Sequence, residues 1–248
     1  MKTKKFEIQN LLSYHYVFVG MADFAKVFKD LAQNLPYYRL AYEGKIFEKE
    51  VFYDVPENLL SSAGLILSKW YNKGNIYFNI GRLNADILAN KRRPAKKFLF
   101  GPCEALDEPR HFSLQIASAI EHSFSSPFSV DLDSIVKQTT PRTEILIEAD
   151  RYQIICGTGY RASMDYEKTT YTDVVTGKKV TKLGVTFNFP FEERDETDEI
   201  LRVIDRKAKG LANFEMSRYE LAQKLLSATN NNARIQLVLD DQEDDGEK

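Results

Sequence analysis

Residues 141–189 read PRTEILIEADRYQIICGTGYRASMDYEKTTYTDVVTGKKVTKLGVTFNF, in which apolar and β-branched residues alternate with polar ones. A period of two is typical of β-strands that bury one face. The pattern predicts four strands in meander order, at residues 142–149, 151–156, 160–172 and 178–189. Thr176-Gly177 provides turn chemistry between the last two. This part of the chain is therefore expected to form an antiparallel sheet.

A second group of strands is predicted in the first third of the chain. Residues 37–42 and 45–54 flank Glu43-Gly44, and residues 65–71 and 75–82 form another predicted hairpin. Extended stretches at 4–12 and 234–239 begin and close the series. Apolar residues at helical spacing predict helices at 24–35, 57–63, 112–124, 131–137, 196–209 and 217–227. The order of elements predicts an α+β fold, a barrel or strongly curved sheet with helices outside and a helical insert at 85–138.

Composition limits the class of protein. The 248 residues are 43% hydrophobic and 28% charged, with a net charge of −2, which is typical of one globular domain, expected at 1–239. Residues 240–248 hold six acids and one lysine and are expected to be a solvated, disordered tail. The sequence contains no apolar run long enough for a membrane span and no export signal, so a cytoplasmic protein without membrane contact is expected. Two cysteines, 103 and 156, without a Cys-x-x-Cys pair favour reduced thiols over a disulfide or a zinc site.

One strongly basic cluster stands out, at residues 91–97. It holds five cations in seven positions and is expected to be an exposed loop. Such a cluster can bind nucleic-acid phosphates, but it lacks interleaved aromatic residues and the chain as a whole is not basic. Nucleic acid is therefore not the expected partner.

Alternation also predicts polar stripes along two strands of the second group. Arg142 and Glu144 share one face of their strand, and Arg161, Asp165 and Glu167 share one face of theirs. Such stripes can face solvent in a sheet that is covered on one side, or they can line a cavity. Composition alone does not decide between these two interpretations.

Several motifs bear on that choice. Residues 52–67 read FYDVPENLLSSAGLIL, residues 141–144 read PRTE, and residues 217–220 read SRYE. In this order the three resemble the signature of the CYTH superfamily, the triphosphate tunnel enzymes that include class IV adenylyl cyclases and thiamine triphosphatases. The resemblance extends over most of residues 1–227.

The resemblance implies an antiparallel eight-stranded β-barrel, or tunnel, with inward cations for a triphosphate and inward carboxylates for Mg or Mn. Polyphosphates need converging cations, and hard divalent ions need carboxylate oxygens. The residues expected to bind phosphate are Arg142, Arg161, Lys182 and Arg82. The residues expected to bind a metal ion are Glu7, Asp165, Glu144 and Glu167.

The sequence also departs from the family's pattern where catalysis would take place. The first strand has Glu7 and then Gln9 and Leu11 in place of a second carboxylate and a lysine, and the two inward arginines expected after Gly64 fall on Ser68 and Trp70. These losses predict a divergent tunnel protein that binds a phosphate-containing or other anionic small molecule and whose metal site is degraded. The alternative is an active Mg- or Mn-dependent triphosphatase, or cyclase, acting on nucleotide, thiamine or inorganic triphosphate.

Overall fold

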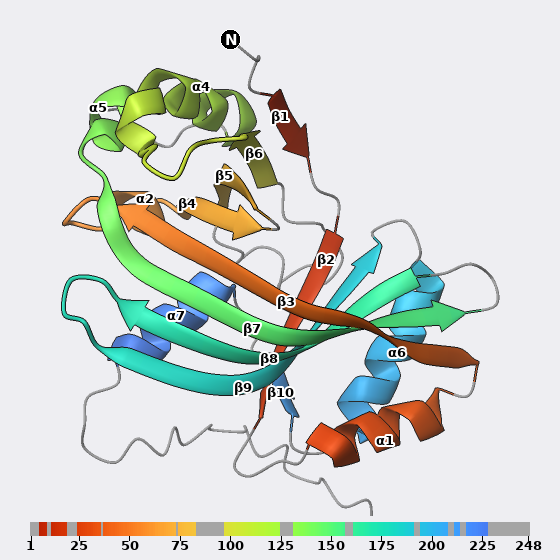
Figure 1. The fold of residues 1–248 in the computed structure, drawn as a ribbon. Coiled ribbons are helices and arrows are strands. Elements are labelled where there is room, and N and C mark those ends of the chain that lie inside the picture. The colour runs from red at the N-terminus through yellow and green to blue at the C-terminus, as the bar shows by residue number, and fades with distance from the viewer. Residues whose placement is uncertain are drawn as a thin grey trace, which may run out of the picture.

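The structure is a computed structural model that describes eleven segments of the chain. They are residues 5–8, 11–18, 24–35, 37–72, 74–82, 97–124, 131–156, 161–190, 194–207, 211–213 and 217–227. The strands are β1 Lys5–Ile8, β2 Leu11–Phe18, β3 Tyr38–Asp54, β4 Leu65–Asn72, β5 Asn75–Arg82, β6 Lys97–Gly101, β7 Thr140–Cys156, β8 Arg161–Asp173, β9 Lys179–Pro190 and β10 Leu211–Asn213. The helices are α1 Phe24–Asn34, α2 Leu59–Ser62, the 3₁₀ helix η1 Pro109–Phe112, α4 Ser113–Phe124, α5 Leu132–Lys137, α6 Arg194–Lys207 and α7 Arg218–Ser227. The predicted α+β class is confirmed (Figure 1).

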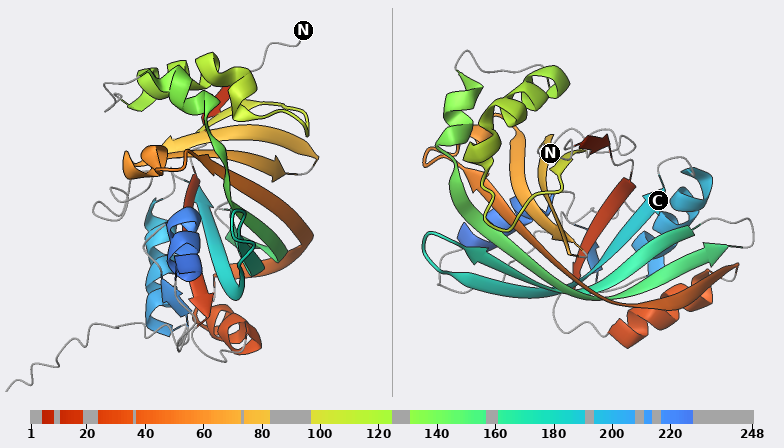
Figure 2. Two further views of the ribbon diagram at one scale, coloured as in Figure 1. Left: turned by 90° about the vertical axis from the view of Figure 1, so that its left-hand side faces the viewer. Right: turned by 45° about the horizontal axis from the view of Figure 1, so that its top comes forward.

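All ten strands form one antiparallel sheet in the order β1-β6-β5-β4-β3-β7-β8-β9-β2-β10. Figure 2 shows how strongly this sheet curves. It is not a closed eight-stranded barrel, because β1 and β10 are its edges within the described segments. The predicted first strand is divided in two: β1 pairs with β6, whereas β2, which starts three positions after Ile8, pairs with β9. β1 and β2 are close in sequence, but they pair with the two opposite ends of the series β6-β5-β4-β3-β7-β8-β9.

Two predicted breaks in the strands are wrong. Glu43-Gly44 does not form a hairpin turn, because residues 38–54 are one strand of 17 residues that pairs with β7 on both sides of Gly44. The register shifts at this point and Gly44 has φ 138°, so the glycine forms a bulge within a continuing strand. The break predicted near Asp150 is also absent, because β7 runs without interruption from Thr140 to Cys156.

Helices cover the outer face of the sheet in two places (Figure 1). At one end α4 and α5 pack on β3, β4, β5 and β6, through buried residues that include Ile116, Val136 and Phe78. At the other end α1 and α6 pack on β7, β8 and β9, through residues that include Leu31 and Ile200. We call the opposite side of the sheet the inner face.

The inner face is covered in part by α7. Tyr219 stacks on Phe52 of β3 with ring centroids 4.8 Å apart, and Ala222 and Leu225 pack with Ile145 and Ile147 of β7. α7 therefore covers the apolar end of the inner face and lies beside the polar middle of that face.

The segment predicted as a helical insert, 85–138, does more than add helices. It also supplies β6, which lies between β5 and β1 in the sheet. Residues 91–96 of the basic cluster, the predicted strand 234–239 and the acidic tail 240–248 lie outside the described residues. None of the described helices combines the length and apolarity that crossing a membrane requires.

Asp54 fixes the connection from β3 to α2, within the stretch that carries the family resemblance. Its carboxylate is 1% exposed, and it accepts hydrogen bonds from the backbone N–H groups of Val55 (2.8 Å), Leu60 (3.0 Å) and Ser61 (3.0 Å). The Ser61 hydroxyl adds a fourth, at 2.7 Å. A buried carboxylate is stable here because backbone donors surround it.

We therefore expect Asp54→Ala to lower the free energy of unfolding by about 3 kcal/mol or more, since it leaves buried N–H groups without acceptors. The matched control is Asp131→Ala, which removes the exposed N-cap of α5 and should cost about 1 kcal/mol. Urea unfolding followed by circular dichroism measures both. Equal losses in the two variants would contradict this role of Asp54.

Candidate functional site

Two acids of β8 point to the inner face of the sheet. Asp165 lies opposite Thr186 and Glu167 lies opposite Gly184 of β9, so the two carboxyl groups emerge on the same side of one strand. Asp165 is 2% exposed and Glu167 is 5% exposed. Buried carboxylates are costly unless cations or donors compensate them, and each of these two has an arginine partner.

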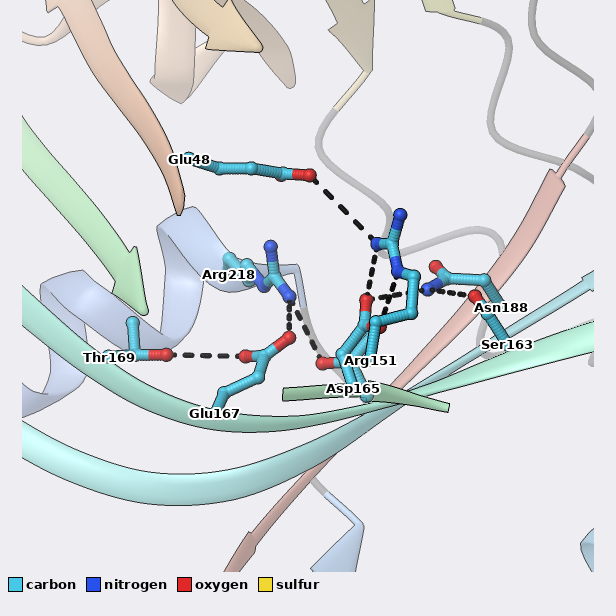
Figure 3. A network of polar contacts seen from close by, with 9 residues as sticks. Glu48, Arg151, Ser163, Asp165, Glu167, Thr169, Asn188 and Arg218 are labelled. Carbon is cyan, nitrogen blue, oxygen red and sulfur yellow. Dashed lines mark hydrogen bonds and ion pairs between the residues drawn. The ribbon is translucent and has the colours of Figure 1, made fainter. Parts of the chain in front are cut away.

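Arg151 of β7 is the partner of Asp165. The two residues are directly opposite in the register, and the Nε and Nη2 atoms of Arg151 donate to the two carboxylate oxygens, both at 2.6 Å. The hydrogen bonds that Arg151 donates to Asp165 are the main reason why the pKa of Arg151 is raised. Nη2 also lies 4.0 Å from Oε1 of Glu48 on β3 (Figure 3). This bidentate pair is therefore a fixed ionic contact between β7 and β8.

Arg218, the first residue of α7, is the partner of Glu167. Its Nη2 atom forms an ion pair with Glu167 and donates to the Thr186 hydroxyl at 3.1 Å. The Thr169 hydroxyl donates to the other oxygen of Glu167 at 3.2 Å. Burial raises the pKa of Glu167, and the charge of Arg218 opposes that rise. The proton affinity of Glu167 therefore depends on whether Arg218 stays beside it.

Asn188 of β9 extends this network, donating from Nδ2 to the Ser163 hydroxyl at 3.2 Å and to Asp165 at 3.3 Å. On β3, Glu50 accepts hydrogen bonds from the Ser68 hydroxyl and from Nδ2 of Asn79. We call Glu48, Glu50, Arg151, Asp165, Glu167 and Arg218 the inner-face network. Its four acids and two arginines give 2 − 4 = −2.

The residues predicted to bind phosphate are dispersed. Lys182 lies opposite Thr169, on the inner face and partly buried. Arg142 lies at the bulge between β7 and β3, and in the described part of the chain its buried Nε atom has no hydrogen-bond partner. Arg82 pairs with Leu65 and Arg161 with Ile155, but the side chains of both lie outside the described part of the structure.

The residues predicted to bind a metal ion do not converge as a set. Asp165 and Glu167 lie together, but Glu144 is on the outer face, opposite Val51, and its carboxylate contacts Nζ of Lys49 at 2.5 Å. The prediction that Glu144 shares a lining with Glu167 is wrong, because the continuous strand places Glu144 and Ala149 on opposite faces. Glu7 lies in β1, opposite Leu99, and its side chain is not described. Among the described residues, no group of three or more His, Cys, Asp or Glu side chains could hold a metal ion.

Sequence reasoning missed the two arginines that organise the network. Arg151 was assigned to a strand separate from residues 142–149; in one continuous strand it shares the inner face with Ile147 and Ala149. Arg218 is the arginine of the SRYE motif, at the position where the resemblance implies the lysine of a serine-lysine-tyrosine sequence. The sequence assigned no role to this residue. The inner arginines expected on β4 are replaced as predicted: Ser68 contacts Glu50 inside, and buried Lys69 donates on the outer side to the carbonyls of Ala105 and Asp107, both at 2.6 Å.

No protein-family model and no curated protein sequence matches this chain. Similar solved structures include a putative adenylyl cyclase from Hippeastrum, described as having a dominant triphosphatase activity, with 8% identity over 87% of this chain and 96% of that chain and a TM-score of 0.51. A protein from Pyrococcus horikoshii is 12% identical over 87% and 99% of the two chains, with a TM-score of 0.48. A putative adenylate cyclase from Vibrio parahaemolyticus is 12% identical over 88% and 99%, with a TM-score of 0.40. On the similarity to the Hippeastrum structure, this chain has a CYTH-like fold.

Proposed function

We propose that this chain is a divergent tunnel protein that binds a phosphate-containing or other anionic small molecule and no longer hydrolyses triphosphates. The main support for this proposal comes from the two inward carboxylates of β8. Each binds its own arginine, so the two do not converge on one point where a metal ion could bind. A hard divalent ion needs several charged oxygens around one point. In this arrangement the guanidinium groups occupy the positions that a metal ion would need.

The tunnel itself is part of the proposal. β1 pairs with β6 and β2 with β9, while only two residues separate β1 from β2. If this stretch acts as one bent strand, it completes a ring of eight with β3 to β9. The inner-face network would then line the lumen, with α7 beside it.

The anion would bind at the arginines, with Lys182 and Arg142 as further candidate cations. Burial raises the pKa of Glu167 and so favours its neutral form, which would no longer form an ion pair with Arg218. Protonation of Glu167 would release Arg218 to an incoming phosphate oxygen. Binding of an anion and uptake of a proton are therefore coupled in this proposal.

The first prediction from this proposal concerns hydrolysis. We expect the purified protein with Mg²⁺ or Mn²⁺ to release no phosphate from tripolyphosphate, thiamine triphosphate or ATP beyond a protein-free control. Phosphate release that Asp165→Asn abolishes would contradict this prediction. It would support the alternative of a metal-dependent triphosphatase, in which Asp165 and Glu167 contribute to a metal site.

The second prediction concerns anion binding. Arg218→Ala should weaken tripolyphosphate binding, measured by calorimetry, about tenfold or more, because a charge-assisted hydrogen bond is lost. Lys224→Ala, an exposed cation on the same helix, is the matched control and should change binding less than twofold. Circular dichroism checks that both variants are folded. Similar affinities for Arg218→Ala and the parent would refute the assignment.

The third prediction concerns pH. As pH falls through the raised pKa of Glu167, the carboxyl group becomes neutral and anion affinity should rise. Glu167→Gln removes that titration, so it should bind tripolyphosphate more tightly than the parent at neutral pH and change less with pH. Titration of tripolyphosphate itself affects both proteins equally and cancels in the comparison. Parallel pH profiles for the two proteins would contradict the proposed coupling.

A further inference from the structure

Glu50 differs from the other acids around it in lacking a cationic partner. Asp165, Glu167 and Glu48 each have an arginine within 4.0 Å, whereas Glu50 has no cation within that distance in the described part of the chain. Its Oε1 atom accepts from Ser68, which is fully buried, and from Nδ2 of Asn79 at 3.1 Å. Two neutral donors therefore hold the carboxylate in place and leave its charge uncompensated by direct contact.

Asn79 supplies a second acceptor at the same place. It is 6% exposed, and its Oδ1 atom is buried without a hydrogen-bond partner among the described residues. The orientation of the amide follows from chemistry, because an ionised carboxylate can only accept and so requires the NH₂ group of Asn79 to face it. The oxygen must then point away from Glu50. Buried acceptors are nearly always paired, so an unpaired one beside an unpaired charge indicates a missing donor.

Two aromatic rings flank these acceptors on the same face. Trp70 is directly opposite Glu50 in the register of β3 and β4, and Tyr77 is opposite Trp70 on β5. The two rings are tilted, with centroids 6.3 Å apart, and both are half-buried. Within the described segments no lysine or arginine lies over either ring; the cation–π contacts found there involve Tyr71 and Phe78.

We propose that Glu50, Asn79, Trp70 and Tyr77 form a binding site for a small organic cation that carries N–H donors, a protonated amine or guanidinium group. Such a group would neutralise Glu50, donate to Oδ1 of Asn79 and rest against the π face of Trp70. The negative charges of Glu48 and Glu50, which share one face of β3, favour a cation here. The direct contacts of this site are separate from those of Arg218 and Glu167, although the charge of Glu50 also acts on Arg218 at longer range.

The test uses methylguanidinium as a probe that has N–H donors and tetramethylammonium as one that has none. Trp70 is the only tryptophan, so its fluorescence reports directly on the site. Titrations at constant ionic strength, repeated by calorimetry, should show saturable binding of methylguanidinium to the full chain. Absence of a saturable signal by both methods would overturn the proposal, and would mean that water alone satisfies Asn79.

Variants locate the site. Glu50→Gln should weaken methylguanidinium binding about tenfold or more, because the charge is lost while the shape is kept. Glu144→Gln removes an outer-face carboxylate that is already paired with Lys49, and it should bind like the parent. Unchanged affinity in Glu50→Gln, or an equal loss in both variants, would overturn the proposal. Thermal unfolding of each variant confirms that it is folded.

Asn79→Leu removes one of the two acceptors, Oδ1 of Asn79, and keeps the other, the Glu50 carboxylate. It should weaken methylguanidinium binding about three- to tenfold, because one hydrogen bond is lost. The affinity for tetramethylammonium, which donates no hydrogen bond, should change less than about twofold. Equal effects on the two probes would show that Asn79 accepts no hydrogen bond from the ligand, contrary to the proposal. Tripolyphosphate is absent from these titrations, so a failure here is distinct from a failure of the anion site.

Discussion

The middle of this structure depends on the compensation of buried negative charge. Asp165 and Glu167 are almost fully buried on one strand, and a carboxylate in such a place costs several kcal/mol unless it is paired. Arg151 comes from the neighbouring strand and Arg218 from a helix near the end of the described chain. The two ion pairs therefore connect β7, β8 and α7 around one point. The stacking of Tyr219 on Phe52 holds α7 in the position from which Arg218 reaches the sheet.

The ion pairs within the chain would also affect the affinity of the proposed sites for their ligands. An anion at Arg218 must compete with a carboxylate that the chain itself supplies, and binding is favourable only if that carboxylate gains a proton or the ligand makes more contacts. Glu50 is under the opposite condition, because its partners are neutral donors and a cation would displace no ion pair. The two proposals therefore place sites of opposite sign on the inner face, one at residues already neutralised within the chain and one at a carboxylate that is not. Their selectivity follows from the pairing within the chain.

Local sequence patterns predicted most helices and the β4–β5 and β8–β9 hairpins, because each depends on neighbours along the chain. They failed where a strand continues through a residue that is typical of turns. Gly44 forms a bulge within β3, and the change at Asp150 does not interrupt β7. A false break also hides which residues share a face, which explains why Glu144 was assigned to the lining and Arg151 was not. The pair between Arg218 and Glu167 joins residues 51 positions apart, and no periodicity reports such a contact.

In the proposed function, the two arginines take the place of a metal ion. A divalent ion bound between Asp165 and Glu167 would have to displace two guanidinium groups, and both would remain buried near the sheet without their partners. Arginine cannot lose its charge to relieve that cost, since its pKa is too high. A metal ion must also give up part of its hydration shell and bear the free-energy cost of association, whereas the arginines are already part of the folded chain. The sequence has Gln9 where the family resemblance implies a second carboxylate, and this supports the proposal that no metal ion replaces the arginines.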